Sequence, residues 1–341
     1  MSAPDVSVVV CTRNRARSLA RTLSTLALQS LPAGLTAELL VVDNGSRDGT
    51  AALVRDRRLL GGPARLVPEP APGLSRARNA GLRAARGRVI LFTDDDVLLP
   101  PAWLVSMATP LLQGRADAVA GSVRLAPHLE RPWMEPFHRA ALAATDLLRS
   151  ENPGVMMGAS MGFGRHVLDR VPAFDERLGA GALGTAEESL FAWQLARAGF
   201  SIGRVEGPAV EHWCDEDRLL RPAYLDAARK LGRSYAYIWY HWLHTSRLGL
   251  EGRSPLGLVR ARETARLRLW RWRLRHPSLA AAREGITRAE FHLVLNHAYI
   301  QQFMKEYREP RRYRRDSEPG PADVTTRQPG EYEPSLHTGP A

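Results

Sequence analysis

The chain has 341 residues, of which 44% are hydrophobic and 24% charged, as is usual for a soluble globular protein. This length allows one large α/β domain with additions, or two domains. The two cysteines, Cys11 and Cys214, exclude a disulfide framework and belong to no zinc-binding cluster. No apolar run reaches the length of about 18 residues that a spanning helix needs, and residues 1–10 lack the basic segment of a secretory signal. We therefore expect a cytoplasmic protein.

The net charge of +11 is unevenly distributed along the chain. Residues 1–216 hold 24 basic and 23 acidic side chains, whereas residues 217–315 hold 22 basic and 8 acidic ones. The positive charge therefore lies in the C-terminal third. Residues 310–341 are polar and rich in proline and glycine, which predicts a disordered tail.

The first 125 residues alternate predicted strands and helices. Apolar runs predict strands at 6–13, 37–45, 64–70 and 88–96, and the segments between them predict helices at 18–29, 49–57 and 75–87. Continuous apolar runs are typical of strands that are buried on both faces of a parallel sheet. Ligands bind such sheets beyond the carboxyl ends of the strands, and polar clusters follow three of the predicted strands.

The middle of the chain is less regular. Residues 126–155 show no clear pattern, and the small residues that follow would let the backbone approach a ligand closely: Gly158, Ala159, Ser160, Gly162 and Gly164. A helix that Thr185 opens and a strand at 204–213 come next. From 217 to 309 the pattern is helical with interleaved arginines and aromatics, although "RLRLWRWRLR" also alternates with period two.

Asp94, Asp95 and Asp96 end the predicted strand at 88–96. Two like charges about 4 Å apart repel by roughly 4 kcal/mol at an effective dielectric near 20, so we expect a cation beside them. A helix N-cap is the alternative, because Pro100 and Pro101 open an apolar segment that predicts a helix. One aspartate would serve as a cap, and the run of three therefore predicts a site for a metal or a charged ligand.

Five segments, taken together, resemble family 2 inverting glycosyltransferases of the GT-A fold. They are "VSVVVCTRNR", "LLVVDNGSRDGT", "GLSRARNAGLRAARGRVILFTDDDVLLPPAWL", "GASMGFGRHVLDRVPAFDERL" and "AEESLFAWQLARAGF". The resemblance implies an α/β fold with a Rossmann-like, mostly parallel central sheet flanked by helices. It places a catalytic domain at 1–216, with nucleotide-sugar binding in 1–125 and the acceptor side in 126–216, followed by a helical extension at 217–309.

The triple aspartate resembles the DxD motif of that family, which holds a Mg²⁺ or Mn²⁺ ion on the diphosphate of a nucleotide-sugar. Hard divalent cations prefer carboxylate oxygens, and the ion neutralises charge on the departing nucleoside diphosphate. The resemblance therefore assigns Asp94 and Asp96 to the metal, and Asp94 and Asp95 to the donor. His212 occupies the place of a histidine that completes the metal or diphosphate shell, and a packed histidine is the alternative.

The resemblance also implies a nucleotide pocket. It places Asp43 on a pyrimidine base, although an Asx-turn also explains an aspartate in "DNG". Thr12, Arg13 and Asn14 follow the first strand and should line the same pocket, and Arg13 could equally be a solvated loop charge. Arg78 matches an arginine beside the diphosphate, and an ordinary surface arginine is its alternative.

Glu187 and Glu188 match a pair that is usually Glu-Asp in the family, where the second acid is the general base on the acceptor hydroxyl. The resemblance therefore makes Glu188 the catalytic residue and Glu187 a substrate-binding one. A carboxylate that is hydrogen-bonded to an alcohol can take its proton as the new bond forms. The alternative is a pair of first-turn glutamates favoured by the helix dipole, with Thr185 as the cap.

The C-terminal arginine-aromatic region has three interpretations. It could contact an anionic membrane through one helical stripe, bind nucleic acid, or pack on the catalytic domain. The stripe comprises Leu258, Ala261, Ala265, Leu269 and Trp272. Membrane contact would place the protein at the inner face of the cell membrane, and we expect nucleic acid not to be a partner.

We therefore expect an inverting glycosyltransferase that depends on Mg²⁺ or Mn²⁺ and uses a nucleoside-diphosphate sugar, most plausibly a UDP-sugar. The acceptor is open: a cell-envelope glycan, a lipid-linked glycan or a small molecule would all fit. A catalytically silent binding protein and a sugar-phosphate nucleotidyltransferase are the alternatives. The second would ordinarily need a glycine-rich phosphate loop after the first strand, and "CTRNRARS" contains no glycine.

Overall fold

The computed structural model describes residues 3–55, 57–147 and 155–313. Its strands are β1 (Val6–Thr12), β2 (Ala37–Asp43), β3 (Arg58–Leu59), β4 (Gly62–Pro63), β5 (Arg65–Pro68), β6 (Val89–Asp94), β7 (Val97–Leu98), β8 (Ala118–Leu125), β9 (Met161–Gly164) and β10 (Ile202–His212). Its α-helices are α1 (Ala16–Leu26), α2 (Thr50–Arg55), α3 (Leu74–Ala84), α4 (Trp103–Leu112), α5 (Pro136–Ala141), α6 (Glu187–Arg197), α7 (Arg221–His241), α8 (Pro255–Arg275), α9 (Pro277–Ala280) and α10 (Arg288–Glu306). The tail predicted for 310–341 lies outside the described residues, apart from 310–313.

Eight strands form one sheet in the order β5-β2-β1-β6-β9-β8-β10-β7. β5, β2, β1 and β6 run parallel, as the apolar runs predicted. β9 is antiparallel to both β6 and β8, and β7 is antiparallel to β10, so the sheet is mixed beyond β6. The sequence pattern missed β8 and β9, because both contain glycine, which is uncommon in strand interiors, and β9 has only four residues.

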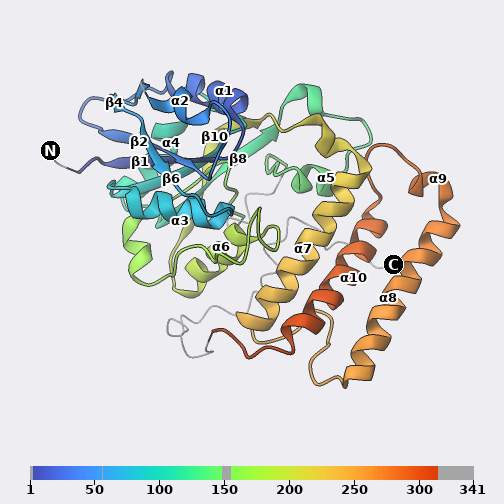
Figure 1. Ribbon diagram of the computed structural model, residues 1–341. Helices are drawn as coiled ribbons and strands as arrows, with labels where there is room; N and C mark the ends of the chain where they lie inside the picture. Colours follow the sequence, from blue (N-terminus) through green and yellow to red (C-terminus); the bar gives the residue numbers. More distant parts are fainter. Residues whose placement is uncertain (1–2, 56, 148–154, 314–341) are drawn as a thin grey trace.

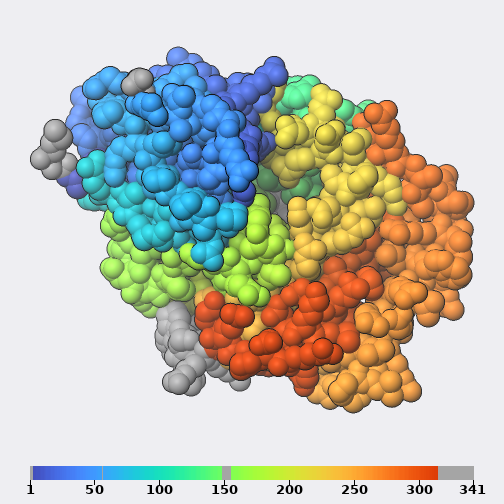
Figure 2. Space-filling model, viewed as in Figure 1, coloured from blue at the N-terminus to red at the C-terminus, as the bar shows by residue number. Residues whose placement is uncertain are grey.

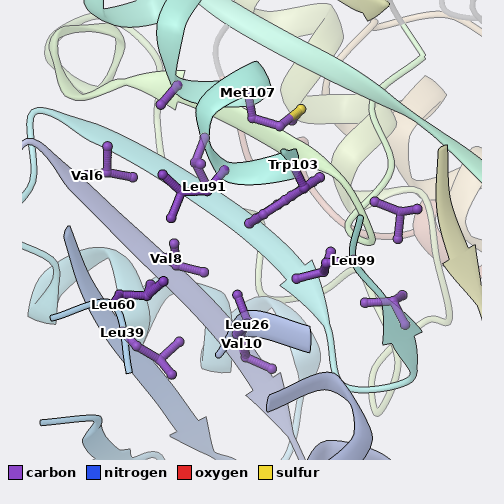
Figure 3. Packing of buried hydrophobic residues seen from close by; sticks show 14 of the residues in the cluster. Val6, Val8, Val10, Leu26, Leu39, Leu60, Leu91, Leu99, Trp103 and Met107 are labelled. Atoms are coloured by element: carbon purple, nitrogen blue, oxygen red, sulfur yellow. The ribbon is translucent and has the colours of Figure 1, made fainter. Parts of the chain in front are cut away.

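Both faces of the sheet are covered, and alternate residues of each strand serve the two sides. Val8 and Val10 of β1 pack with α1 and α4 on one face, where Leu26, Leu91 and Trp103 join them (Figure 3). The intervening residues of the same strands pack against α3 and α6 on the other face. This period of two, with apolar side chains on both sides, explains why the strands read as continuous apolar runs.

The C-terminal third forms a layer of helices beside the sheet, with α7 and α10 next to each other and α8 at the outer edge (Figure 1). α8 spans the "RLRLWRWRLR" segment as a continuous helix, so the period of two in that segment does not mark a strand. α7 also packs on α6, where Tyr237 and Ile238 contact Leu190 and Trp193. Across the described ranges, no helix combines the length and apolarity needed to cross a bilayer.

Candidate active site

A pocket of about 720 Å³ lies beyond the carboxyl ends of β1 and β6. Its walls come from the two halves of the chain: the ends of β1 and β6 with α3 on one side, and α5, α6 and α7 on the other. Figure 2 shows a hollow between the blue N-terminal part and the yellow helix α7. The pocket therefore has the position that the parallel strands predict for a ligand.

The triple aspartate lies in this pocket. Asp94 has 33% of its side chain exposed, whereas Asp95 and Asp96 have only 6% and 5%. The next helix, α4, has Ala102 as its N-cap, so none of the three aspartates caps it. The charged run thus serves the pocket rather than the helix start.

Arg15 pairs with the two buried aspartates, Asp95 and Asp96, and we call these three residues the Arg15 cluster. Its Nη1 lies 2.9 Å from Asp95 Oδ1 and 2.9 Å from Asp96 Oδ2. The Thr12 hydroxyl donates to Asp95 Oδ2 at 2.6 Å, and His212 Nε2 lies 3.3 Å from Asp96 Oδ1. Burial raises the pKa of Asp95 to about 7 despite Arg15. For Asp96 burial is outweighed by His212 and Arg15, which hold its pKa below the usual range.

Arg78 pairs with three further acids of the pocket, Asp94, Glu187 and Glu188, and we call these four residues the Arg78 cluster. Its side chain is only 2% exposed, with Nη1 2.7 Å from Glu187 Oε1 and Nη2 2.9 Å from Glu188 Oε1. The same Nη2 lies 3.8 Å from Asp94 Oδ1. One buried guanidinium therefore joins the triple aspartate to the glutamate pair, and Arg78 is no ordinary surface arginine.

The three acids of the Arg78 cluster differ in their pKa values. Burial raises the pKa of Asp94 to about 6, against the opposing charge of Arg78. Burial and the neighbouring Glu188 raise the pKa of Glu187 to about 8. Burial also acts on Glu188, but Arg78 and backbone hydrogen bonds outweigh it and lower the pKa. Near neutral pH, Glu188 is therefore ionised and Glu187 carries a proton.

Two unusual features of the backbone, at Ala186 and at Gly158, help to position the Arg78 cluster. Ala186, the N-cap of α6, has φ = 71°, a left-handed conformation that costs a non-glycine residue roughly 1–2 kcal/mol. Thr185 is not the N-cap of α6. Ala186 holds that position, and its side chain makes no capping hydrogen bond. At Gly158 a Cβ atom would collide with the guanidinium of Arg78, so this glycine allows the close approach of Arg78 rather than of a ligand.

The residues predicted for the nucleotide lie around the ends of β1 and β2. Thr12 and Arg13 line the pocket, whereas Asp43 and Asn14 do not. Asp43 Oδ1 accepts a hydrogen bond from Ser46 N at 2.8 Å, as in the turn interpretation. Asn14 has φ = 53° and accepts from Arg47 N at 2.7 Å, so its side chain stabilises the loop.

The acids of the pocket fit a hard divalent cation. Among the described residues, no group of three or more His, Cys, Asp or Glu side chains is placed to hold a metal ion by itself. Mg²⁺ is usually bound by one or two carboxylates together with substrate phosphates and water, which Asp94 and Asp96 could provide. His212 Nδ1 bonds to the Leu142 carbonyl at 2.8 Å, which leaves Nε2 toward Asp96. Burial lowers the pKa of His212, and Asp96 more than offsets this, so the pKa is raised.

Three cations of the pocket were not predicted from the sequence: Arg15, Arg218 and Lys230. Arg15 stands in the polar "CTRNR" cluster, so its position after the first strand was the available signal. Arg218 and Lys230 come from beyond the resemblance, and their place in the pocket depends on how α7 packs. Arg15 pairs with Asp95 and Asp96, and Lys230 pairs with Asp226 at 2.6 Å, so these two cations offset acids of the same pocket.

Known proteins are similar to this chain in sequence and in fold. Residues 7–171 match the family model described as "Glycosyl transferase family 2". The glycosyltransferase AglE of Haloferax volcanii is 31% identical over 121 residues, which cover 35% of this chain and 40% of AglE. The succinoglycan biosynthesis protein ExoO of Rhizobium meliloti is 37% identical over 129 residues, covering 35% and 32%. The chain thus spans less than half the length of these two curated relatives.

Among solved structures, the mannosyltransferase PcManGT of Pyrobaculum calidifontis, in complex with GDP-Man and Mn²⁺, superposes with a TM-score of 0.52. The two are 21% identical, and the superposition covers 76% of this chain and 68% of PcManGT. This likeness shows the GT-A fold. The resemblance seen in the sequence is thus supported independently: residues 7–171 are similar to family 2 glycosyltransferases.

Proposed function

We propose that the pocket transfers a sugar from a nucleoside-diphosphate sugar to an acceptor hydroxyl, with inversion at the anomeric carbon. The observation that carries this proposal is the position of Arg78. Its guanidinium contacts Glu188 and lies 3.8 Å from Asp94, so the donor-side and base-side carboxylates surround one fixed cation. The name of the relative AglE, a glycosyltransferase, and the family model matched by residues 7–171 support the same activity.

Asp94 and Asp96 would hold a Mg²⁺ or Mn²⁺ ion together with the donor diphosphate. When bound, the ion neutralises the charge that develops on the departing nucleoside diphosphate. Arg218 and Lys230 line the same pocket and supply further positive charge to the phosphates. Glu187 lines the same pocket and would bind a substrate hydroxyl there.

Glu188 accepts the proton of the acceptor hydroxyl while the oxygen attacks the anomeric carbon from the side opposite the diphosphate. The bond from that carbon to the diphosphate oxygen breaks in the same step, and its electron pair leaves with the nucleoside diphosphate. A single displacement inverts the configuration and forms no covalent enzyme intermediate. Glu188 is suited to this role because it is the ionised member of the pair.

We further propose a UDP-sugar as the donor, with Asp43 on the pyrimidine. Asp43 lies next to Thr12 across β1 and β2, at the edge where the pocket begins. PcManGT, which shares the fold, was solved with GDP-Man, so GDP is the competing nucleotide. The acceptor class stays open between a glycan, a lipid-linked glycan and a small molecule. Contact of residues 217–309 with an anionic membrane is part of the proposal.

Calorimetric titration of UDP, dTDP and GDP into the full chain, with and without Mn²⁺, tests the nucleotide and the metal together. We expect UDP to bind in the presence of Mn²⁺ and binding to vanish in Asp96→Asn. Asp215→Asn is the matched control, because Asp215 also contacts Arg15 but is 79% exposed. Tighter binding of GDP would correct the donor, and failure of all three nucleotides would overturn the proposal.

The pH dependence of the same titration tests the role of Asp94. Its pKa in the folded protein is raised to about 6, and only the ionised carboxylate can bind a cation. Below that pH, protons compete with Mn²⁺, so Mn²⁺-supported affinity should fall by up to about tenfold per pH unit as the pH decreases, and should level off above it. Affinity that stays constant through this window would remove Asp94 from the metal site.

A further inference from the structure

Helix α8 has two apolar faces, and only one of them packs on the protein. Leu258 is 5% exposed, Ala261 and Ala265 pack beside it against α7 and α10, and Leu269 packs against a neighbouring cluster. These four belong to the stripe that the sequence suggested for membrane contact. Leu258 is buried and the other three are partly buried against the neighbouring helices, so that stripe is not a free surface.

The opposite face of α8 carries a second set of large apolar side chains that are exposed. They are Leu256 (60% exposed), Val259 (36%), Leu267 (48%), Trp270 (57%) and Leu274 (60%). At about 100° per residue, the five fall within an arc of roughly 80° that points away from the packed face. α8 forms the outer edge of the molecule, so this stripe faces solvent along the length of the helix (Figure 1).

Arginines flank this exposed stripe on both sides. The helix contains seven arginines, namely Arg260, Arg262, Arg266, Arg268, Arg271, Arg273 and Arg275, and one acid, Glu263. Glu263 lies within the stripe, but Arg262 and Arg266 pair with it at 2.8 and 3.4 Å. The stripe is therefore bordered by positive charge, and its one acid is neutralised locally.

Two cationic hollows lie beside the same helix, one between α8 and α10 and the other between α8, α7 and α10. One, of about 290 Å³, is lined by Arg262, Lys305 and Arg308. The other, of about 370 Å³, is lined by Arg229, Arg273 and again Lys305, among others. Their size and charge suit phosphate groups next to an inserted apolar stripe.

We propose that the outward face of α8 docks on an anionic phospholipid bilayer, with the apolar stripe at the boundary of headgroups and acyl chains and the arginines on lipid phosphates. A second copy of the chain fits less well, since two strongly positive helices would repel each other. Nucleic acid would meet the arginines but leave the leucines in water. The inference deepens the membrane contact in the proposed function, and it stands independently of sugar transfer.

Co-sedimentation of the full chain with vesicles tests the inference. We expect binding to vesicles made of equal parts phosphatidylglycerol and phosphatidylcholine, and none to phosphatidylcholine alone. Replacing Leu267, Trp270 and Leu274 together by serine should weaken binding on the order of a hundredfold, because it removes apolar surface that would be buried in the bilayer. All three side chains are exposed, so we expect the substitutions to leave the fold intact. Arg271→Gln should weaken it by about fivefold.

The matched control is Leu28→Ser with Leu147→Ser, two side chains that are 67% and 63% exposed outside α8. This variant should bind vesicles like the unmodified chain. Absence of vesicle binding, or binding that the triple serine variant retains, would overturn the inference. Binding of DNA or RNA in place of vesicles, or self-association through this face, would also overturn it. Mn²⁺-dependent nucleotide binding, measured on the triple variant, reports separately on the proposed function.

Discussion

Arg15 and Arg78 both pair with aspartates of the same three-residue run, yet their surroundings differ. Arg15 has 33% of its side chain exposed and also reaches the exposed Asp215 at 3.4 Å. Arg78 is 2% exposed and has three carboxylates around it, with Gly158 closing the space behind. Water can replace much of what Arg15 does, whereas Arg78 is the one cation within the described ranges that pairs with Asp94, Glu187 and Glu188. The acids beside Arg78 should therefore depend on their arginine far more than those beside Arg15.

Loss of the Arg78 charge is the strongest way to test this difference. Arg78→Met leaves Glu187, Glu188 and Asp94 without their cation in a low-dielectric site, which should lower the free energy of unfolding by roughly 3–5 kcal/mol. Arg78→Lys keeps one charge but cannot hold both glutamates, so an intermediate loss is expected. Urea unfolding followed by circular dichroism measures both. An unchanged unfolding midpoint in Arg78→Met would refute the account of this cluster.

Glu188→Gln and Glu187→Gln compare the catalytic roles of the two glutamates in the Arg78 cluster. Glutamine keeps an oxygen for Arg78 but cannot accept a proton, so kcat should fall by about 10²- to 10⁴-fold while nucleotide affinity stays near its original value. Glu187→Gln replaces a group that already carries a proton near neutral pH, and its rate should fall less. Steady-state kinetics with a transferable donor give both values. Equal losses in the two variants would contradict Glu188 as the base.

Arg15→Gln should have the smallest effect. Thr12 and His212 still reach the two buried aspartates when the guanidinium is removed, and Arg15 itself is one-third exposed, so water can enter the space that it leaves. We expect the free energy of unfolding to fall by about 1 kcal/mol, with Asp215→Asn within roughly 0.5 kcal/mol of the original chain. Urea unfolding followed by circular dichroism measures both free energies of unfolding. A loss in Arg15→Gln as large as that in Arg78→Met would erase the distinction between the clusters.

The part of the fold that could be predicted from the sequence is the part built by local patterns. β1, β2 and β6 are long apolar runs, and polar residues mark the ends where the pocket forms. β8 and β9 were not predicted, because their glycines interrupt the apolar pattern and their pairing depends on the neighbouring strands. The contact of Arg78 with Glu187 joins residues 109 positions apart, and no local pattern reports such a pair. Only the resemblance had placed these residues at one site.

The helical region shows a second limit of prediction from sequence. The stripe beginning at Leu258 and the stripe beginning at Leu256 both have helical spacing, and periodicity does not reveal which one the protein covers. Packing against α10 decides it. The general arrangement of helices could be predicted, but the free face of α8 became visible only in the folded chain.

The two walls of the pocket differ in how far they are shared with related proteins, and this bears on how the pocket could evolve. The family-model match covers residues 7–171 and so contains the triple aspartate, whereas α7, the helix of the facing wall, lies beyond it and beyond the resemblance seen in the sequence. Substitutions along α7, for example at Ala223 or Ala227, could reshape the far wall without touching Asp94. A duplicated copy of this protein could thus acquire a new acceptor while its donor chemistry is inherited unchanged.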